Sequence, residues 1–159
     1  QKDLVSRGKY LVDSVAACGT CHTPRKGAEE DKTMYLAGHP AGTSAQAFGM
    51  EMLQQGIFIT IGRTYSSFAG PWGVSFSSNL TPDKATGLGN WTEQKFILSM
   101  RTGQHLGDPK NRPILPPMPW KHYQGLYDED LRAIWAYLRT IPPVRNPVPP
   151  ALNQVGKPY

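Results

Sequence analysis

The chain has little cysteine and no long apolar run. Only two of its 159 residues are cysteines, and hydrophobic residues make up 39% of the sequence. No stretch approaches the roughly eighteen apolar residues that a membrane-spanning helix needs, so no transmembrane segment is predicted. There is no basic run with interleaved aromatic residues, which argues against nucleic-acid binding. A charged leader followed by an apolar stretch is also missing at Gln1, so we expect a mature chain from which an export signal has been removed.

Acidic residues are the scarcer charged class. Seventeen basic and twelve acidic side chains give a formal net charge of +5, which suits an acidic protein partner. Glycine and proline are plentiful, with 16 and 15 residues, so much of the chain is expected in turns and extended loops. No internal repeat is visible, and the length predicts one domain.

Both cysteines fall in one short motif. Cys18 and Cys21 are followed directly by His22, which gives the C-x-x-C-H pattern that attaches c-type haem. At this spacing each thiol can bond one vinyl group of the same porphyrin, and the adjacent imidazole then lies beneath the iron. The motif occurs once, so the sequence predicts one covalently bound haem c per chain.

Three other sites could use these residues, and each needs something that the sequence lacks. A structural zinc site needs four ligands, and none of the three remaining histidines makes a closely spaced second pair. A thioredoxin-type redox pair normally follows a strand, whereas Cys18 ends a segment with helical periodicity. A disulfide between Cys18 and Cys21 would close a strained two-residue loop. Haem attachment is therefore the preferred interpretation.

The segment before the motif has helical spacing of apolar residues. Residues 3–17 are predicted to form an amphipathic helix that is capped by Asp3 and carries Cys18 at its end. The residues expected on its apolar face are Leu4, Gly8, Leu11, Val12 and Val15.

Two later helices are predicted. One has Thr92 as its N-cap and ends near Gly103, and the other starts at Asp128 and is stopped by Pro142 and Pro143. The residues expected to face inward are Phe96, Ile97 and Met100 in the first, and Leu131, Ile134, Trp135 and Leu138 in the second.

The remaining segments give weaker patterns. Residues 45–55 resemble a short helix ended by Gly56, and residues 57–61 and 74–78 are candidates for a small antiparallel hairpin. Six prolines fall after Ile141, which excludes helix for most of the last eighteen residues. We therefore divide the chain into a haem domain, residues 1–141, and an extended C-terminal arm, residues 142–159. Packing of the arm on the domain's own surface is favoured over docking to a partner.

The ligand on the face of the iron opposite His22 would decide between electron transfer and small-molecule chemistry. Met118 lies in the run Pro113-Ile-Leu-Pro-Pro-Met-Pro-Trp120, whose prolines restrict the backbone, so its thioether would lose little entropy on binding iron. A neutral thioether raises the reduction potential relative to imidazole and leaves no site for oxygen or peroxide. The predicted iron ligands are therefore His22 and Met118, and the predicted role is electron transfer.

Other side chains are alternatives for that position. His105 and His122 are the fallback ligands, and a bis-histidine iron would have a lower potential. Met100 is expected on the apolar face of a helix and is assigned to the core. The remaining methionines are Met34 in a charged loop, and Met50 and Met52 on the short helix expected at 45–55.

These features together resemble the class I cytochromes c. Several stretches, about half of the chain, are similar more narrowly to the cytochrome c subunits of bacterial periplasmic dehydrogenases, such as quinone-dependent alcohol dehydrogenases and hydroxylases of the nicotinate and isoquinoline type. Residues 27–75 match little of this pattern. The similar stretches are Ser77-Ser-Asn-Leu-Thr-Pro-Asp83, Thr86-Gly-Leu-Gly-Asn-Trp-Thr92, Arg101-Thr-Gly103, Pro117-Met-Pro-Trp120 and Asp128-Glu-Asp-Leu131.

The resemblance implies a mainly α, single-domain class I cytochrome c fold with long loops, one small β-hairpin and a C-terminal helix that crosses the first. It implies a periplasmic carrier that relays single electrons from a dehydrogenase or quinol to a terminal acceptor. Asn79 would then lie near the haem, at a propionate, although a turn role before Pro82 explains it equally well. Such subunits usually carry several haem modules, whereas this chain has one motif, so the partner stays open.

Three questions remain open at this stage. Lys110, Arg112 and Lys121 flank the methionine loop and form either a basic collar that steers an acidic partner or a set of solvated charges. An open sixth site would instead make a haem enzyme or sensor that binds a small ligand. A third alternative is a chain that works only as an obligate subunit of a larger dehydrogenase.

Overall fold

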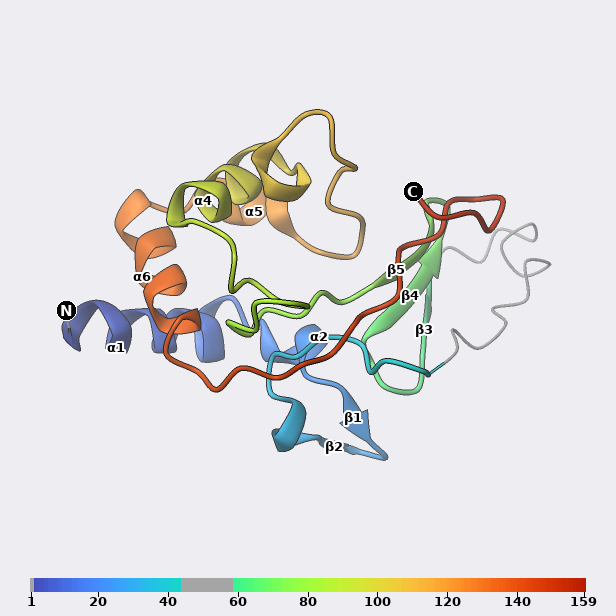
Figure 1. Cartoon of the computed structure of the whole chain (residues 1–159), viewed down its shortest axis with the longest axis horizontal. Helices are drawn as coiled ribbons and strands as arrows, with labels where there is room; N and C mark the ends of the chain where they lie inside the picture. The colour runs from blue at the N-terminus through green and yellow to red at the C-terminus, as the bar shows by residue number, and fades with distance from the viewer. Residues whose placement is uncertain (1, 44–58) are drawn as a thin grey trace.

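The structure, a computed structural model, describes residues 2–43 and 59–159. Figure 1 shows the longer helices α1 (Lys2–Tyr10), α4 (Glu93–Thr102) and α6 (Asp128–Leu138) gathered at one end of the molecule. Strands β3 (Thr60–Ile61), β4 (Ser67–Gly70) and β5 (Gly73–Phe76) lie at the other end. The shorter elements are a π-helix (Leu11–Val15), α2 (Gly19–His22), β1 (Arg25–Lys26), β2 (Glu29–Glu30), two 3-10 turns (Lys32–Met34 and His105–Gly107) and α5 (Trp120–Tyr123). The expected helical fold with small antiparallel sheets is confirmed.

The N-terminal helix differs from its prediction in three details. It includes Lys2, so Asp3 lies within the first turn instead of capping the helix, where its charge still favours the helix dipole. The α-helix ends at Tyr10 and continues as a wider π turn. Gly8, Leu11 and Val12 are buried as expected, but the ends of the apolar stripe are not, because Leu4 is 37% and Val15 54% exposed.

The later helices form as predicted. The Thr92 hydroxyl accepts from the backbone N–H of Lys95, which caps α4, and Gly103 ends the helix in the left-handed conformation, with φ of 68°. Helix α6 begins at Asp128 and buries the four residues expected to face inward. Phe96 and Trp135 bring the two helices together, with ring centroids 5.6 Å apart.

The two terminal helices cross, and the crossing depends on a glycine. A Cβ on Gly8 would stand 1.9 Å from the carbonyl oxygen of Ala133, so only glycine permits this approach of α1 to α6. Beside the crossing, Arg7 forms an ion pair with Asp130, with Nε 2.9 Å from Oδ1. The main hydrophobic core lies around these helices and includes Leu11, Val12, Leu36, Leu88, Phe96, Ala133, Ile134, Trp135, Tyr137, Leu138 and Ile141.

The predicted hairpin pairing was wrong. Strands at residues 60–61 and 73–76 exist, but both pair antiparallel with β4, which lies between them in the sheet. β4 was missed because all four of its residues are buried, so it lacks the polar and apolar alternation of a half-exposed strand. Residues 57 and 58, and the helix expected at 45–55, lie outside the described residues.

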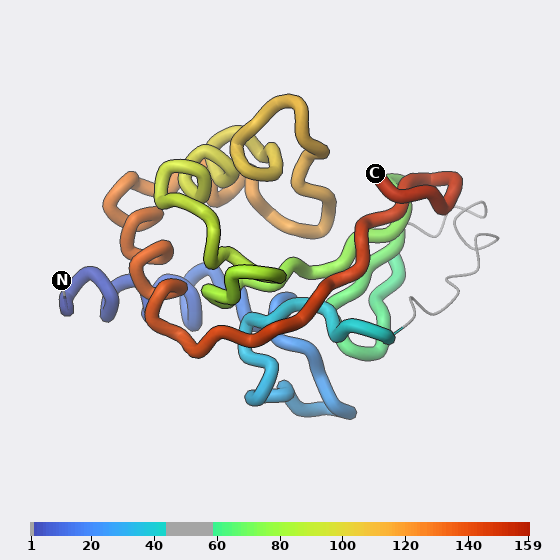
Figure 2. The backbone as a smooth tube through the Cα atoms, viewed as in Figure 1, coloured from blue at the N-terminus to red at the C-terminus, as the bar shows by residue number. Residues whose placement is uncertain are grey.

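The C-terminal residues run back across the body of the protein (Figure 2). After α6 the chain is extended and contacts two distant segments. The Asn146 side chain accepts from the N–H of Ala41 and donates to the carbonyls of Ala37 and His39. Farther along, Val74 and Leu152 exchange two backbone hydrogen bonds of 2.8 Å. Within these described ranges, no helix combines the length and apolarity needed to cross a bilayer.

Candidate functional site

A large cavity lies between the helical end and the strands. Its volume is about 790 Å³, within the range of about 300–1,000 Å³ typical of ligand pockets, and its walls are mostly apolar. Cys18, Cys21, His22 and Met118, the four residues that the sequence predicted as a haem site, all line it. The structure therefore brings together side chains almost one hundred positions apart.

The C-x-x-C-H motif forms one short helical turn. Cys18 precedes α2 as its N-cap, and the His22 N–H donates to the Cys18 carbonyl at 2.9 Å. Residues at i, i+3 and i+4 share a helix face, so Cys21 and His22 lie on the side of the turn that also carries Cys18. Before the turn, Ala17 adopts a φ of 47°, which ends the preceding helix.

The His22 ring is held in one orientation and one tautomer. Its Nδ1 lies 2.8 Å from the backbone carbonyl oxygen of Ser78. Because a carbonyl oxygen only accepts, Nδ1 must carry the proton, and the lone pair of Nε2 is left free for a metal. The residue is 8% exposed, and burial lowers the pKa of His22, which also favours the neutral ring that binds iron.

Both thiols are unpaired and held in a weakly polar environment. Neither forms a disulfide. Burial raises the pKa of the Cys18 thiol to about 11 and also raises the pKa of Cys21. At neutral pH both are therefore neutral thiols, which distinguishes them from the low-pKa thiolates of redox-active cysteine pairs.

The loop that carries Met118 is anchored on two sides. Near its start, the N–H of Ile114 donates to the Gly103 carbonyl at 2.7 Å. Gly103 itself must be glycine, because a Cβ there would stand 2.4 Å from the Trp120 indole. Near the methionine, the Ser75 hydroxyl of β5 donates to the Pro116 carbonyl at 2.6 Å. In Figure 1 this loop and α5 lie on the side of the molecule away from α2.

The other candidate ligands separate into two groups. Met100 and His105 also line the cavity, whereas His122 and Met34 do not. Met100 packs partly against the hydrophobic core, in agreement with the core role expected for it. Met50 and Met52 lie outside the described residues.

Asn79 and Arg112 both line the cavity. The Asn79 Oδ1 accepts from the N–H of Thr81, which confirms its expected turn role before Pro82. Its amide also donates to the Thr86 hydroxyl and to the Val144 carbonyl, so it holds the C-terminal arm, which the sequence did not predict. Arg112 lines the cavity and is half-buried, unlike Lys110 and Lys121, which are exposed on the surface. Of the three residues considered either for a basic collar or as solvated charges, only Lys110 and Lys121 are therefore fully on the surface.

Sequence comparison decides the family. The family model described as "Cytochrome c" matches residues 5–142. The chain belongs to the cytochrome c family. Family membership brings a covalently bound haem c and a role in electron transfer. The C-terminal arm after residue 142 lies beyond the match.

The relatives confirm the narrower resemblance to dehydrogenase subunits. The cytochrome subunit of fructose dehydrogenase from Gluconobacter japonicus is 31% identical over 146 residues, 91% of this chain and 23% of that protein. A subunit of nicotinate dehydrogenase from Pseudomonas putida is 35% identical over 89 residues, 56% of this chain and 7% of that protein. The cytochrome c subunit of a quinone-type alcohol dehydrogenase from Gluconacetobacter polyoxogenes is 29% identical over 140 residues, 88% and 25% respectively. The chain thus spans a quarter or less of the length of these relatives.

The side chains that line the cavity are chemically suited to binding a haem. Two thiols on one helix face can form thioethers, and a neutral imidazole with a free Nε2 lies next to them. Thioether sulfur is offered by Met118 and Met100, and the large apolar lining suits a flat porphyrin. Among the described residues there is no cluster of three or more histidine, cysteine or acidic side chains that would suggest a different metal centre.

Proposed function

We propose that the chain is a one-electron carrier whose single haem c is bound through Cys18 and Cys21, with His22 and Met118 as axial ligands. The observation that carries the proposal is the His22 ring, fixed by the Ser78 carbonyl in the tautomer that leaves Nε2 free, inside a cavity that Met118 also lines. When bound, haem iron supplies a one-electron ferric and ferrous couple.

The protein's own residues position and shield that couple. The Ser78 carbonyl holds the His22 ring, and Ser75 holds the loop before Met118. Residues held by their neighbours in this way move little when the iron gains or loses an electron. Small movements favour fast electron transfer. The mostly apolar walls would limit the access of water to a haem that fills the cavity.

Met118 is preferred to Met100 as the sulfur ligand for two reasons. Met100 lies on the face of α4 that packs against the hydrophobic core. Met118 instead lies on a separate loop whose backbone is tied to β5 and to Gly103. With both axial positions filled by side chains, the iron has no site for a small substrate, which supports a carrier over a haem enzyme or sensor.

The partner is proposed to be a periplasmic dehydrogenase, and a terminal acceptor would take the electron onward. This rests on the names of the relatives, which are subunits of fructose, nicotinate and alcohol dehydrogenases. A second candidate follows from the same comparison: because this chain covers a quarter or less of the length of those proteins, it would correspond to one module of a larger dehydrogenase subunit. Exposed Lys110 and Lys121 would attract an acidic partner surface.

Near-red absorption spectroscopy of the ferric protein, combined with a redox titration, tests the axial ligands directly. A sulfur-to-iron charge-transfer band is expected, together with a potential in the range of His and Met cytochromes. Absence of that band from a folded protein with covalently bound haem would reject Met118 and Met100 together. Retention of the band by the isolated chain, with rapid exchange of electrons in solution, would support an independent carrier over an obligate subunit.

A further inference from the structure

The cavity has an unusual distribution of charge. In the described part of the chain, Arg112 is the only permanently charged residue that lines it, and no aspartate, glutamate or lysine does so. A cavity with one cationic side chain and no acidic side chain in its described wall is suited to a ligand that brings its own negative charge.

Arg112 has unused hydrogen-bonding capacity. Its Nη1 donates to the carbonyl of the next residue, Pro113, at 3.0 Å. Among residues 2–43 and 59–159, it forms no ion pair with a carboxylate. Arg112 is half-buried, and this burial lowers the pKa of its guanidinium. A guanidinium has five N–H donors, so most of those on Arg112 are available to a ligand in the cavity.

The groups around Arg112 do not neutralise it. The N–H of His105 donates to the Arg112 backbone carbonyl at 3.1 Å, and its ring meets Trp91 edge-on at 5.2 Å. Burial, aided by the charge of Arg112, lowers the pKa of His105, so the imidazole is neutral at physiological pH. Tyr159 of the C-terminal arm lines the same cavity and is anchored through its hydroxyl, which donates to the Trp72 carbonyl at 2.6 Å.

We propose that Arg112 is the carboxylate-binding residue of the cavity, that a haem propionate is its ligand, and that Tyr159 of the C-terminal arm covers this corner. The proposal rests on the proposed function only in requiring a haem in the cavity, and it does not depend on which side chain is the sixth ligand. A guanidinium can donate two parallel hydrogen bonds to one carboxylate, which a lysine cannot do. The arm lies beyond residues 5–142, so this cover is not supplied by the family domain.

The charge of Arg112 has a measurable consequence for reduction. A cation beside a carboxylate lowers the pKa of that carboxylate, which then stays ionised from mildly acidic to alkaline pH. Without the cation, burial raises that pKa toward neutrality, and protonation becomes coupled to the charge on the iron. The other titratable groups that line the cavity are Cys18, Cys21, His22, His105, Tyr123 and Tyr159.

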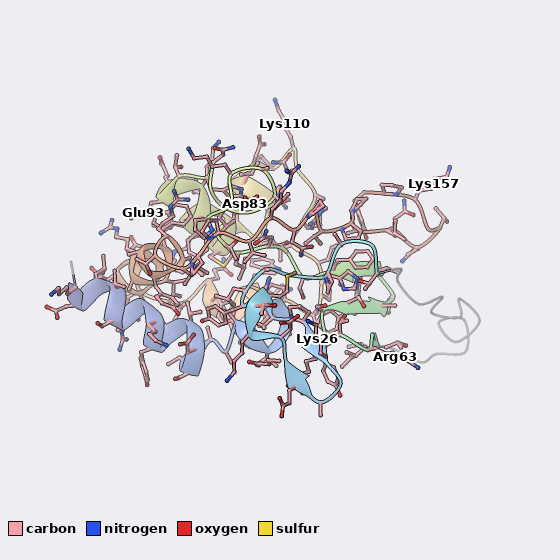
Figure 3. All side chains as sticks on the ribbon, turned by 60° about the horizontal axis from the view of Figure 1, so that its bottom comes forward. Lys26, Arg63, Asp83, Glu93, Lys110 and Lys157 are labelled. Atoms are coloured by element: carbon pink, nitrogen blue, oxygen red, sulfur yellow. The ribbon has the colours of Figure 1, made fainter. Side chains whose placement is uncertain are left out.

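The test is the reduction potential as a function of pH in Arg112→Gln, with Arg112→Lys and Lys110→Gln as comparisons. Lys110 is exposed, and Figure 3 shows it projecting away from the body, so its replacement removes the same charge without touching the cavity. In R112Q we expect the reduction potential to fall as pH rises near neutrality. At alkaline pH this potential should lie below that of the wild type, because a nearby cation has been lost. R112K and K110Q should keep the flat profile of the wild type.

A profile in R112Q that runs parallel to the wild type would overturn the proposal, because a purely structural arginine would change stability without changing this slope. Haem retention and the near-red band are measured in every variant, so loss of the axial ligand is distinguished from loss of the carboxylate partner. If R112Q does not fold, infrared difference spectra of the wild type with carboxyl-labelled haem show whether the propionates are ionised. Only ionised propionate bands are expected at neutral pH, and a protonated acid band from both propionates would reject the assignment.

Discussion

Gly8 of α1 lies against the backbone of Ala133 in α6, and a residue with a Cβ could not approach that backbone so closely. A Cβ at Gly8 would stand 1.9 Å from the Ala133 carbonyl oxygen and 2.8 Å from the Tyr137 Cβ. Neither neighbour is the flexible end of a side chain. The distance between the two terminal helices is therefore set by this glycine, and the π-helix Leu11–Val15 connects α1 to the turn that carries the haem motif.

Gly8→Ala is expected to destabilise the folded protein. The added methyl group forces the helices apart, which costs about 1–3 kcal/mol or more in the free energy of unfolding. Urea denaturation followed by circular dichroism measures the change. Gly125→Ala is the matched control: its nearest neighbour would lie 3.6 Å away, so stability should stay within about 0.5 kcal/mol of the wild type. Equal stability of the two variants would show that the crossing tolerates a side chain.

Met118→Ala is expected to abolish the near-red band of the ferric protein and to lower the reduction potential. It should also let carbon monoxide or cyanide bind promptly at neutral pH, as seen in the Soret band, because the sixth position becomes open. Met100→Leu replaces the other methionine of the cavity with a side chain of similar volume and should leave all three properties unchanged. The reverse pattern in the two variants would move the ligand to Met100.

His39 is expected to make stability fall in mild acid. The ring is 2% exposed, its Nδ1 lies 3.0 Å from the Ser66 hydroxyl, and burial lowers the pKa of His39. The unfolded chain therefore takes up a proton before the folded one, so the free energy of unfolding is highest above about pH 6.5 and falls as pH drops below it. Urea titrations between about pH 7.5 and pH 5 should show this slope, and His39→Gln should reduce it. An unchanged slope in the variant would assign it to other groups, such as His105.

Asn146→Ala should loosen the C-terminal arm. Asn146 is 3% exposed and bonds three backbone groups, of which the carbonyls of Ala37 and His39 would lose their partner while buried and the N–H of exposed Ala41 would not. We expect a loss of at least about 2 kcal/mol in the free energy of unfolding and faster proteolysis within the arm. Gln154→Ala removes an exposed bond to the Pro71 carbonyl and should change stability by less than about 0.5 kcal/mol. Similar protease resistance in both variants would mean that the arm is held elsewhere.

Electrostatic steering by the surface lysines is tested with an anionic oxidant. Oxidation of the reduced protein by ferricyanide should slow in Lys121→Glu and should lose part of its dependence on ionic strength, because Lys121 is exposed beside the methionine loop. Lys32→Glu makes the same charge change away from the cavity wall. If both variants slow equally, only the net charge matters and the surface lysines near the loop have no special role.

The features that the sequence predicted well are those encoded locally. Thr92 and Gly103 bound α4 because a hydroxyl cap and a left-handed glycine act on their own neighbours. The motif at Cys18 determines its own helical turn in the same way. Met118 was predicted as a ligand because its prolines mark a restricted loop, and only the folded chain places it in one cavity with His22.

The features that were missed depend on distant parts of the chain. The Ser78 carbonyl that orients His22 carries no signal of side-chain identity, because any residue has that oxygen. The turn role of Asn79 before Pro82 is confirmed, because its Oδ1 accepts from the N–H of Thr81, but the bond from its amide to the distant Val144 carbonyl was missed. β4 had one usable signal, the Gly70-Pro71-Trp72-Gly73 turn, which marks a hairpin with β5.

The contacts of the C-terminal arm imply an order of assembly. Asn146 bonds residues that precede it by 105 to 109 positions, and Pro147–Ala151 then line the cavity. Contacts across so long a stretch of chain are slow to form, because the intervening loop must be ordered first. During synthesis, the wall formed by Pro147–Ala151 is therefore completed only after the other walls of the cavity. Until then this side of the cavity is open and a large flat cofactor can enter, and the same residues later close it.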